Sequence, residues 1–199
     1  MSARIYIEGG GKSKELHSRC REGFRRLFEK CGYRGRMPRL VACGSREEAF
    51  RDFQTAHAYR KSEDYVAMLI DSEDPVRDIE KVWDHLTQRD GWRKPDGAED
   101  GQVLLMTTCM ETWIATDRGA LQNHYGSCLQ ENALPNLVDI EQRGRHAVQD
   151  SLAHATRRCK TTYTKGAHSF LLVAELNPDT LKKHLPSFAR CARILSEKL

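Results

Sequence analysis

Three acidic residues follow directly on a short apolar run in the first half of the chain. Residues 66–70 read Val-Ala-Met-Leu-Ile, and Asp71, Glu73 and Asp74 come immediately after them. The run has the length of one fully buried strand, and ligands of open α/β sheets bind beyond the carboxyl ends of such strands. Asp71 and Glu73 flank one point if the chain stays extended, and carboxylate oxygens are preferred ligands of Mg²⁺ and Mn²⁺. The pattern therefore favours a divalent-metal site. The alternative is that Asp71 ends a strand and the other acids face water.

Two further acids stand where other apolar segments end. Glu8 closes the first apolar segment, just before three consecutive glycines, and Glu111 follows the fourth. Crossover connections bring neighbouring ends of parallel strands to one edge of a sheet, so we expect Glu8, Asp71 and Glu73 to lie within a few ångströms of one another. Glu111 is a fourth candidate ligand, although a lone carboxylate at a helix start is more commonly a cap.

Lys12 and Ser13 follow the three glycines and invite comparison with the phosphate-binding P-loop, G-x-x-x-x-G-K-[ST]. The comparison fails, because the first glycine of that motif would fall at Tyr6, inside the expected strand. We therefore exclude a P-loop nucleotide-binding protein.

Basic and acidic residues are segregated along the chain. Residues 11–46 contain eleven Lys or Arg and three acids, whereas residues 71–100 contain ten acids and five bases. Acids that hold a metal and bases that hold phosphates would together suit a nucleic acid. The alternative is that the charged helix faces are merely solvated. The residues expected to contact a nucleic acid are Lys12, Arg19, Arg25, Arg26 and Lys30.

Apolar periodicity predicts strands that alternate with helices. Such alternation predicts an α/β fold with a mostly parallel sheet of about four strands, flanking helices and right-handed crossovers. After Gly126 the pattern is helical, so we expect an α/β domain over residues 1–125 and a helical C-terminal extension over 126–199, packed on the same core. The expected strands cover residues 4–7, 39–43, 65–70 and 102–107, the expected helices 14–31, 46–57 and 75–88, and an expected loop 90–101.

The composition is that of a globular protein with a sizeable core, because 39% of the 199 residues are hydrophobic and 30% are charged. No apolar run approaches the roughly 20 residues of a membrane span, and the N-terminus lacks the apolar segment of a signal peptide. Seven single cysteines without a Cys-x-x-Cys pair favour reduced thiols. These observations predict a cytoplasmic protein without membrane contact.

The placement of the acids resembles the Toprim superfamily, the catalytic fold of topoisomerases, bacterial primases and overcoming-lysogenization-defect nucleases. That fold carries a glutamate and a glycine after its first strand, and an Asp-x-Asp pair after a later one. Here Glu8-Gly9 and Asp71-Ser72-Glu73 occupy those places, with Glu instead of the second Asp. The resemblance implies a Toprim-like sheet, and it leaves open whether Glu73 or Asp74 completes the pair.

A closer resemblance covers nearly the whole chain. The chain resembles a small stand-alone Toprim-like family of bacterial proteins, catalogued as a domain of unknown function. Members are often encoded beside an ATPase of the structural-maintenance or AAA type, in settings linked to phage defence. That family usually has Glu-Gly-x-Thr-Glu where this chain has Glu-Gly-Gly-Gly-Lys at residues 8–12. The matching residues are Glu8-Gly9, Ile70-Asp71, Met110-Glu111-x-Trp113 with Ala115 and Asp117, Tyr163-x-Lys165, His168 and Pro186-Ser187-Phe188.

The resemblance implies metal-assisted cleavage of a phosphodiester in DNA or RNA. Asp71 and Glu73 would hold Mg²⁺ or Mn²⁺, and Glu8 would ligate that ion or a second one, or accept a proton from the attacking water. Glu111 is a candidate ligand of a second ion. Lys165 would neutralise the charge that develops on the phosphate.

Two interpretations remain open. In the first, the protein is a nuclease that serves as the effector of a bacterial defence system and is gated by an ATPase subunit of the structural-maintenance or AAA type. In the second, it is a non-catalytic subunit that binds the ATPase or nucleic acid, and its acids serve structure alone. A homo-oligomer is compatible with both. Glu8, Asp71 and Glu73 favour the nuclease, whereas the Glu-Gly-Gly-Gly-Lys turn keeps the subunit interpretation open.

Overall fold

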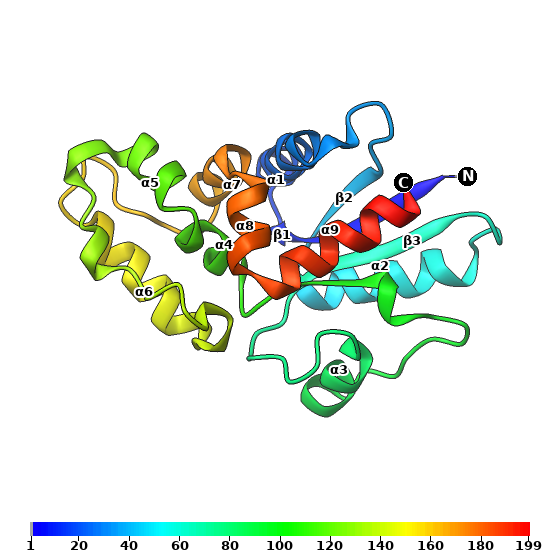
Figure 1. The fold of residues 1–199 in the computed structure, drawn as a ribbon. Coiled ribbons are helices and arrows are strands. Elements are labelled where there is room, and N and C mark those ends of the chain that lie inside the picture. The colour runs from blue at the N-terminus through cyan, green and yellow to red at the C-terminus, as the bar shows by residue number, and fades with distance from the viewer. Residues whose placement is uncertain (1) are drawn as a thin grey trace.

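Four strands form one parallel sheet in the computed structural model, which describes residues 2–199 (Figure 1). The strands are β1 (Ala3–Gly10), β2 (Arg39–Gly44), β3 (Tyr65–Asp71) and β4 (Val103–Met106). Their order across the sheet is β2-β1-β3-β4, and every neighbouring pair is parallel. The expected α/β fold class, with a sheet of about four strands, is therefore confirmed.

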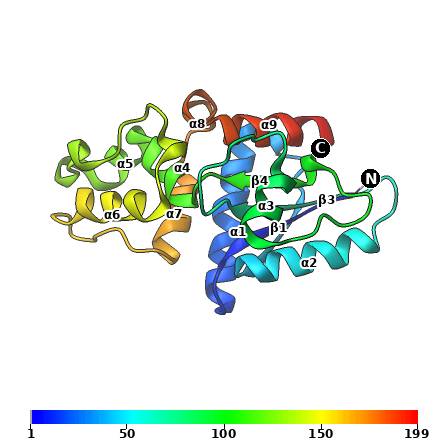
Figure 2. The same ribbon diagram turned by 90° about the horizontal axis from the view of Figure 1, so that it is seen from below.

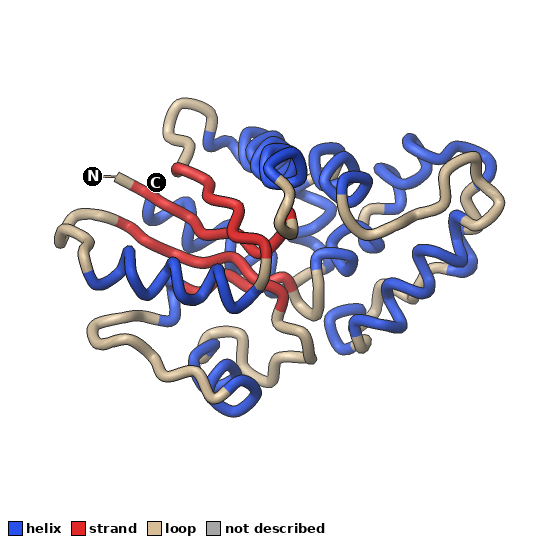
Figure 3. Tube along the Cα trace, turned by 180° about the vertical axis from the view of Figure 1, so that it is seen from behind, coloured by secondary structure: helices blue, strands red, loops and turns tan. Residues whose placement is uncertain are grey.

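Helices cover both faces of the sheet, as the view from behind shows (Figure 3). One face is covered by α1 (Lys14–Phe28) and α9 (Pro186–Lys198), and the other by α2 (Arg46–Ala58) and α3 (Val82–Asp90). Successive side chains of a strand point to opposite faces. In β3, Leu69 therefore joins the first core and Ile70 the second. All seven residues of β3 are buried, which explains why this strand is apolar throughout rather than alternating.

A group of shorter helices lies at the carboxyl end of the strands, on the left of Figures 1 and 2. Trp113, in this group, packs edge-to-face against Phe24 of α1 and Phe188 of α9, so the N-terminal and C-terminal parts share one core. The division of the chain at residue 125 stays a prediction. The helices are α4 (Met110–Thr116), α5 (Arg118–Tyr125), α6 (Arg145–Thr156) and α7 (Ala167–Glu175), and α8 (Pro178–His184) then leads into α9.

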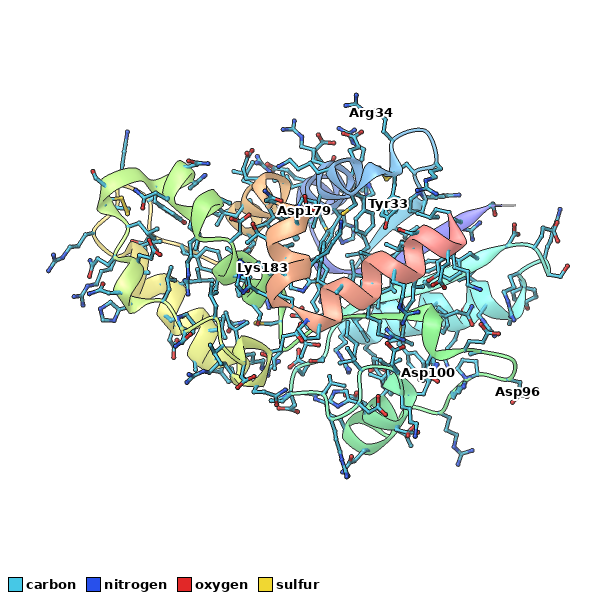
Figure 4. The ribbon with its side chains drawn as sticks, in the orientation of Figure 1. Tyr33, Arg34, Asp96, Asp100, Asp179 and Lys183 are labelled. Carbon is cyan, nitrogen blue, oxygen red and sulfur yellow. A yellow bond between two sulfur atoms is a disulfide. The ribbon has the colours of Figure 1, made fainter. Side chains whose placement is uncertain are left out.

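The last helix is tied by a buried hydrogen bond to the turn that follows the first. The hydroxyl of Tyr33, labelled in Figure 4, donates to the carbonyl oxygen of Ala192 at 2.9 Å. Within residues 2–199, no helix combines the length and the apolar character that crossing a membrane requires.

The helix expected over residues 75–88 begins only at Val82. Val76 is buried, and the N–H of Trp83 donates to Asp100 Oδ1 at 3.0 Å, so contacts with the core and with a later loop hold this segment in an irregular path. The expected start at Pro75 is wrong, because such tertiary contacts override a local helix-start signal. The helix expected over 14–31 ends at Phe28 and continues as a wider π-helical turn over Glu29–Tyr33.

Cys128 and Cys159 form a disulfide, visible as the yellow bond on the left of Figure 4. The expectation that all seven cysteines are reduced thiols is wrong for this pair, whereas the other five are free. Cys128 lies in the turn after α5, Cys159 follows α6, and their Cα atoms are 5.2 Å apart, within the range that a disulfide needs. The two residues are 31 positions apart and belong to no local motif, so the sequence did not indicate the bond.

Helices α1 and α7 touch at Gly23, where a side chain has no room. A Cβ atom at this position would lie 2.5 Å from the backbone carbonyl oxygen of Phe170. We expect Gly23→Ala to lower the free energy of unfolding by about 1–3 kcal/mol, because the backbone of α7 has to move. Chemical denaturation measures this change.

The control for this prediction is Gly119→Ala in α5. There the nearest atom to an added Cβ, Asp117 Oδ1, is 3.5 Å away, which is ordinary contact. Alanine is the better helix former by about 1 kcal/mol, so this variant should be unchanged or more stable. A Gly23→Ala protein as stable as the control variant would contradict the close packing of α1 on α7.

Candidate metal centre

Three of the four predicted acids come together at the carboxyl edge of the sheet. Glu8, Asp71 and Glu73 each place one carboxylate oxygen within 4.8 Å of those of the other two. Glu8 belongs to β1 and Asp71 ends β3, and these strands are neighbours in parallel register, with Ile7 opposite Leu69. The sheet topology therefore produces the convergence that we expected from the sequence.

Backbone N–H groups orient the first two carboxylates. The N–H of Asp71 donates to Glu8 Oε2 at 3.0 Å, and the N–H of Met110, at the start of α4, donates to Asp71 Oδ1 at 2.8 Å. Each carboxylate keeps its second oxygen for a ligand. Glu73 has a φ of 70°, and its N–H donates to the carbonyl oxygen of Thr108 at 2.8 Å. A positive φ is uncommon outside glycine, and such positions cluster at functional sites.

Burial makes this cluster a costly place for negative charge. Asp71 is 4% exposed, and burial raises its pKa well above the usual range, with a further rise from the charges of Glu8 and Glu111. Burial also raises the pKa of Glu8, although the hydrogen bond from Asp71 lowers it. Two neighbouring carboxylates that repel each other are stabilised by a proton or a cation between them. Because all the donors are carboxylate oxygens, the cluster could hold a hard divalent cation.

Lys165 adds one positive charge beside the acids. Its Nζ lies 3.9 Å from Asp71 Oδ2, in the turn before α7. Burial of the ammonium lowers the pKa of Lys165, but the neighbouring carboxylates outweigh burial and raise the pKa above its ordinary value. The side chain is 61% exposed although its ammonium lies near the carboxylates. An incoming anion can therefore reach this ammonium.

A cavity of about 360 Å³ opens beside Asp71 and Lys165. Much of its wall is glycine backbone. Gly10 has a φ of 90°, and a Cβ atom there would lie 2.6 Å from the ring of His17, so the last residue of β1 has no room for a side chain. Backbone can thus approach a ligand closely. The lining residues are Glu8, Gly9, Gly10, Gly11, Leu16, Gly44, Asp71, Met106, Met110, Lys165, Gly166 and Phe170.

Glu111 is fully buried and lies outside the group of three. The hydroxyl of Tyr163 donates to its Oε1 at 2.9 Å, and Gln149 Nε2 donates to its Oε2 at 3.3 Å. Protein donors thus contact both oxygens, and Glu111 affects the cluster through its charge, which raises the pKa of Asp71. Its role as a ligand of a second ion stays a prediction.

Two arginines that the sequence did not single out contact Glu73. Arg145 forms an ion pair with its carboxylate, and Arg89 Nη2 lies 3.4 Å from its Oε2. Asp74 is exposed and pairs with Arg89 at 2.8 Å, which leaves Glu73 as the third acid of the cluster. Both arginines are distant from Glu73 in sequence and belong to no recognisable motif, so only the fold brings them here.

The five basic residues expected to contact a nucleic acid lie on or beside α1. Three of them pair with acids of the same helix or of the turn that follows it. Lys30 donates to the carbonyl oxygens of Ala174 and Leu176 at 2.8 and 3.3 Å, and Lys12 is exposed next to the glycines that line the cavity. Their contact with nucleic acid stays a prediction. The ion pairs are Arg19–Glu15, Arg25–Glu22, Arg25–Glu29 and Arg26–Glu22.

A buried carboxylate away from the cluster makes stability depend on pH. Glu141 accepts hydrogen bonds from the hydroxyl and, at 3.2 Å, from the N–H of Ser187 at the start of α9. Burial raises the pKa of Glu141 from 4.5 to about 7. Because the folded pKa lies above the unfolded one, folding favours the protonated form. The resulting stabilisation is fully present below pH 4.5 and is lost as the pH rises through about 7.

Glu141→Gln removes this titration and keeps an oxygen that accepts from Ser187. The free energy of unfolding of the variant, relative to the wild type, should therefore rise by up to about 3 kcal/mol between pH 4.5 and pH 8. Denaturant titrations of both proteins across this range measure the difference. Two pH profiles that run parallel would contradict the raised pKa.

Comparison with known proteins identifies a family for this chain but does not indicate an activity. A family model described as a domain of unknown function (DUF4276) matches residues 7–195, nearly the whole chain. No curated protein and no solved structure matches the chain significantly.

Proposed function

The chain belongs to the DUF4276 family, and we propose that it is a Mg²⁺- or Mn²⁺-dependent nuclease that hydrolyses phosphodiesters of DNA or RNA. The observation that carries this proposal is the convergence of Glu8, Asp71 and Glu73 at the carboxyl edge of the sheet, with the ammonium of Lys165 beside them. Phosphoryl transfer needs carboxylates that hold a cation and a positively charged side chain that contacts the phosphate, and both are present here. The Toprim-like resemblance of the sequence points the same way.

The residues present fit a divalent cation. Asp71 and Glu73 would hold it, and Glu8 beside them would either be a further oxygen ligand or accept a proton from the attacking water. When bound, such a cation draws charge away from a non-bridging phosphate oxygen and so stabilises the transition state. The raised pKa of Asp71 means that part of the energy of cation binding compensates for the burial of like charges.

The chain's own residues supply orientation and proton transfer. Glu8 is oriented by the N–H of Asp71, and its raised pKa suits it to accept the proton of the attacking water. The oxygen of that water bonds to phosphorus, the bond from phosphorus to the leaving sugar oxygen breaks, and the leaving oxygen takes a proton from solvent. Lys165 places its ammonium where the phosphate gains negative charge.

The proposal includes control by a partner in the cytoplasm. An unregulated nuclease would damage the nucleic acids of its own host. We therefore expect weak activity from the protein alone. Activation would come from an ATPase subunit of the structural-maintenance or AAA type, within an antiviral defence system.

The decisive experiment is a cleavage assay. The protein is incubated with Mn²⁺ and plasmid DNA or tRNA, with and without a candidate partner ATPase of the structural-maintenance or AAA type, and Asp71→Ala is run in parallel. Cleavage that requires Asp71 supports the nuclease. No cleavage with the partner present, together with an Asp71→Ala protein that still functions in cells, would rule it out.

One observation favours the non-catalytic alternative. Glu73 is already neutralised by Arg145 and Arg89, as a structural carboxylate would be. In a subunit that only binds an ATPase or nucleic acid, these ion pairs would persist in the presence of Mn²⁺. Mn²⁺ binding measured by calorimetry distinguishes the two, because a cation at the cluster has to compete for Glu73.

A further inference from the structure

Glu73 has two competing sets of partners. On one side it completes the group of acids with Glu8 and Asp71, and on the other it faces Arg145 and Arg89. Its side chain is 13% exposed, so its carboxylate is confined to this position. A cation held by Glu73 would sit close to both guanidinium groups, and like charges at that distance repel each other.

The two arginines are held very differently. Arg89 contacts three carboxylates, those of Glu73, Asp74 and Asp90. Asp90 also pairs with Arg46 at 2.7 Å, so Arg89 belongs to a network that stays intact without Glu73. For Arg145, Glu73 is the single carboxylate partner found among residues 2–199. Its side chain is 37% exposed, which leaves it free to move if that partner is lost.

We propose that Arg145 is a substrate-binding residue that exchanges Glu73 for a phosphate of the nucleic acid when a divalent cation occupies the acidic cluster. This inference rests on the proposed function. The cation takes over the carboxylate of Glu73, and the released guanidinium then faces the edge where the cation sits. A guanidinium presents a planar fork of donors that matches two phosphate oxygens, so a phosphate is the natural replacement for a carboxylate.

The exchange couples the binding of the cation to the binding of the nucleic acid. In the cation-free protein Arg145 is engaged with Glu73 and is a poor ligand for a phosphate. In the cation-loaded protein it is released, so the cation strengthens nucleic-acid binding, and by reciprocity nucleic acid strengthens cation binding. The ion pair with Glu73 opposes cation binding and thereby keeps the substrate-free site from holding the cation tightly.

Arg145→Gln tests this exchange, because it should change the two affinities in opposite directions. The dissociation constant for Mn²⁺, measured by calorimetry without nucleic acid, should fall about two- to tenfold, since a competitor for Glu73 is removed. The dissociation constant for a fluorescent 12-nucleotide single-stranded DNA, measured by anisotropy in Ca²⁺ to limit cleavage, should rise about tenfold. Arg145→Lys keeps the positive charge but lacks the planar fork of donors. Its dissociation constant for the DNA should lie between those of Arg145→Gln and the wild type.

Arg157→Gln is the matched control. Arg157 is an exposed arginine at the other end of α6, about 18 Å from Arg145 along a 12-residue helix, so the same charge is removed far from the cluster. It should leave Mn²⁺ binding unchanged. Equal melting temperatures of the three variants and the wild type would show that Arg145 is not needed for folding.

The outcomes separate this inference from the proposed function. If the wild type binds Mn²⁺ and the DNA, but Arg145→Gln weakens both or changes neither, Arg145 only supports the local structure and the inference is overturned. If the wild type itself does not bind Mn²⁺, the proposed metal site is wrong, and the exchange is ruled out as well. If Arg145→Gln binds Mn²⁺ more tightly and the DNA more weakly than the wild type does, the exchange is supported.

Discussion

Saturating Mn²⁺ should raise the melting temperature of the wild-type protein by about 10 °C at pH 8. A ligand that binds only the folded state at a thousandfold excess over its Kd stabilises that state by about 4 kcal/mol, and one kcal/mol corresponds to about 2–4 °C for a chain of this size. The proposed site consists of Glu8, Asp71 and Glu73, whose carboxylates converge only in the folded protein. Differential scanning fluorimetry with Mn²⁺, Mg²⁺ and a chelator measures the shift.

The shift should shrink towards pH 5. The folded pKa values of Asp71 and Glu8 are raised from 3.8 and 4.5, so these groups stabilise the cation-free protein at low pH and lose that contribution as the pH rises. A cation replaces the protons and compensates for the loss at higher pH. Asp71→Asn should therefore melt at or above the wild-type temperature in chelator at pH 8, and should show little response to Mn²⁺.

Asn at this position keeps an oxygen that can accept from the N–H of Met110, so the variant should remain folded. A melting temperature that Mn²⁺ raises equally in the wild type and in Asp71→Asn would mean that the cation binds elsewhere. The acidic cluster would then be structural.

Lys165→Met should lower kcat/KM for nucleic-acid cleavage about 10²–10³-fold under conditions in which the wild type cleaves. Removing a preorganised group that stabilises developing charge has a cost of this size. The ammonium lies 3.9 Å from Asp71 Oδ2, beside the cavity that would receive the phosphate. Mn²⁺ binding should not weaken, because the variant loses a positive charge next to the ligands.

Lys160→Met is the matched control for Lys165. It removes an exposed lysine from the same connection between α6 and α7 and should cleave at the wild-type rate. Lys165→Arg should restore part of the activity, since a cation is present again. Equal rates for Lys165→Met and Lys160→Met would remove Lys165 from the mechanism.

The strand at residues 65–71 illustrates what could be predicted from sequence. A continuous apolar run indicates burial on both faces, and an acid at its end indicates the carboxyl edge of a parallel sheet. The same logic placed Glu8 at the end of the first strand. That strand continues to Gly10, but the adjacency of β1 and β3 still brings Glu8 to Asp71. Local pattern and a general rule of topology therefore suffice for Glu8 and Asp71. Glu73 reaches them through a backbone with a φ of 70° rather than through the extended chain that we expected.

Features that depend on distant pairs were not predictable in this way. The ion pair of Arg145 with Glu73 and the disulfide of Cys128 with Cys159 join residues whose surroundings in sequence carry no signal. The late start of α3 has the same origin, because Asp100, well after it in the chain, accepts from the N–H of Trp83. A single sequence records local preference, whereas these contacts are set by how the helices pack.

The order of the cluster's parts along the chain has a consequence for its synthesis. Glu8 and Asp71 leave the ribosome early, but the N–H of Met110 that orients Asp71 and the ammonium of Lys165 follow much later. A nascent or truncated chain therefore carries the carboxylates without the N–H that orients Asp71 and without the ammonium of Lys165. If the protein is a nuclease, it becomes competent to cut only when its translation is nearly finished, so the messenger and ribosomal RNA around the growing chain are not exposed to it prematurely.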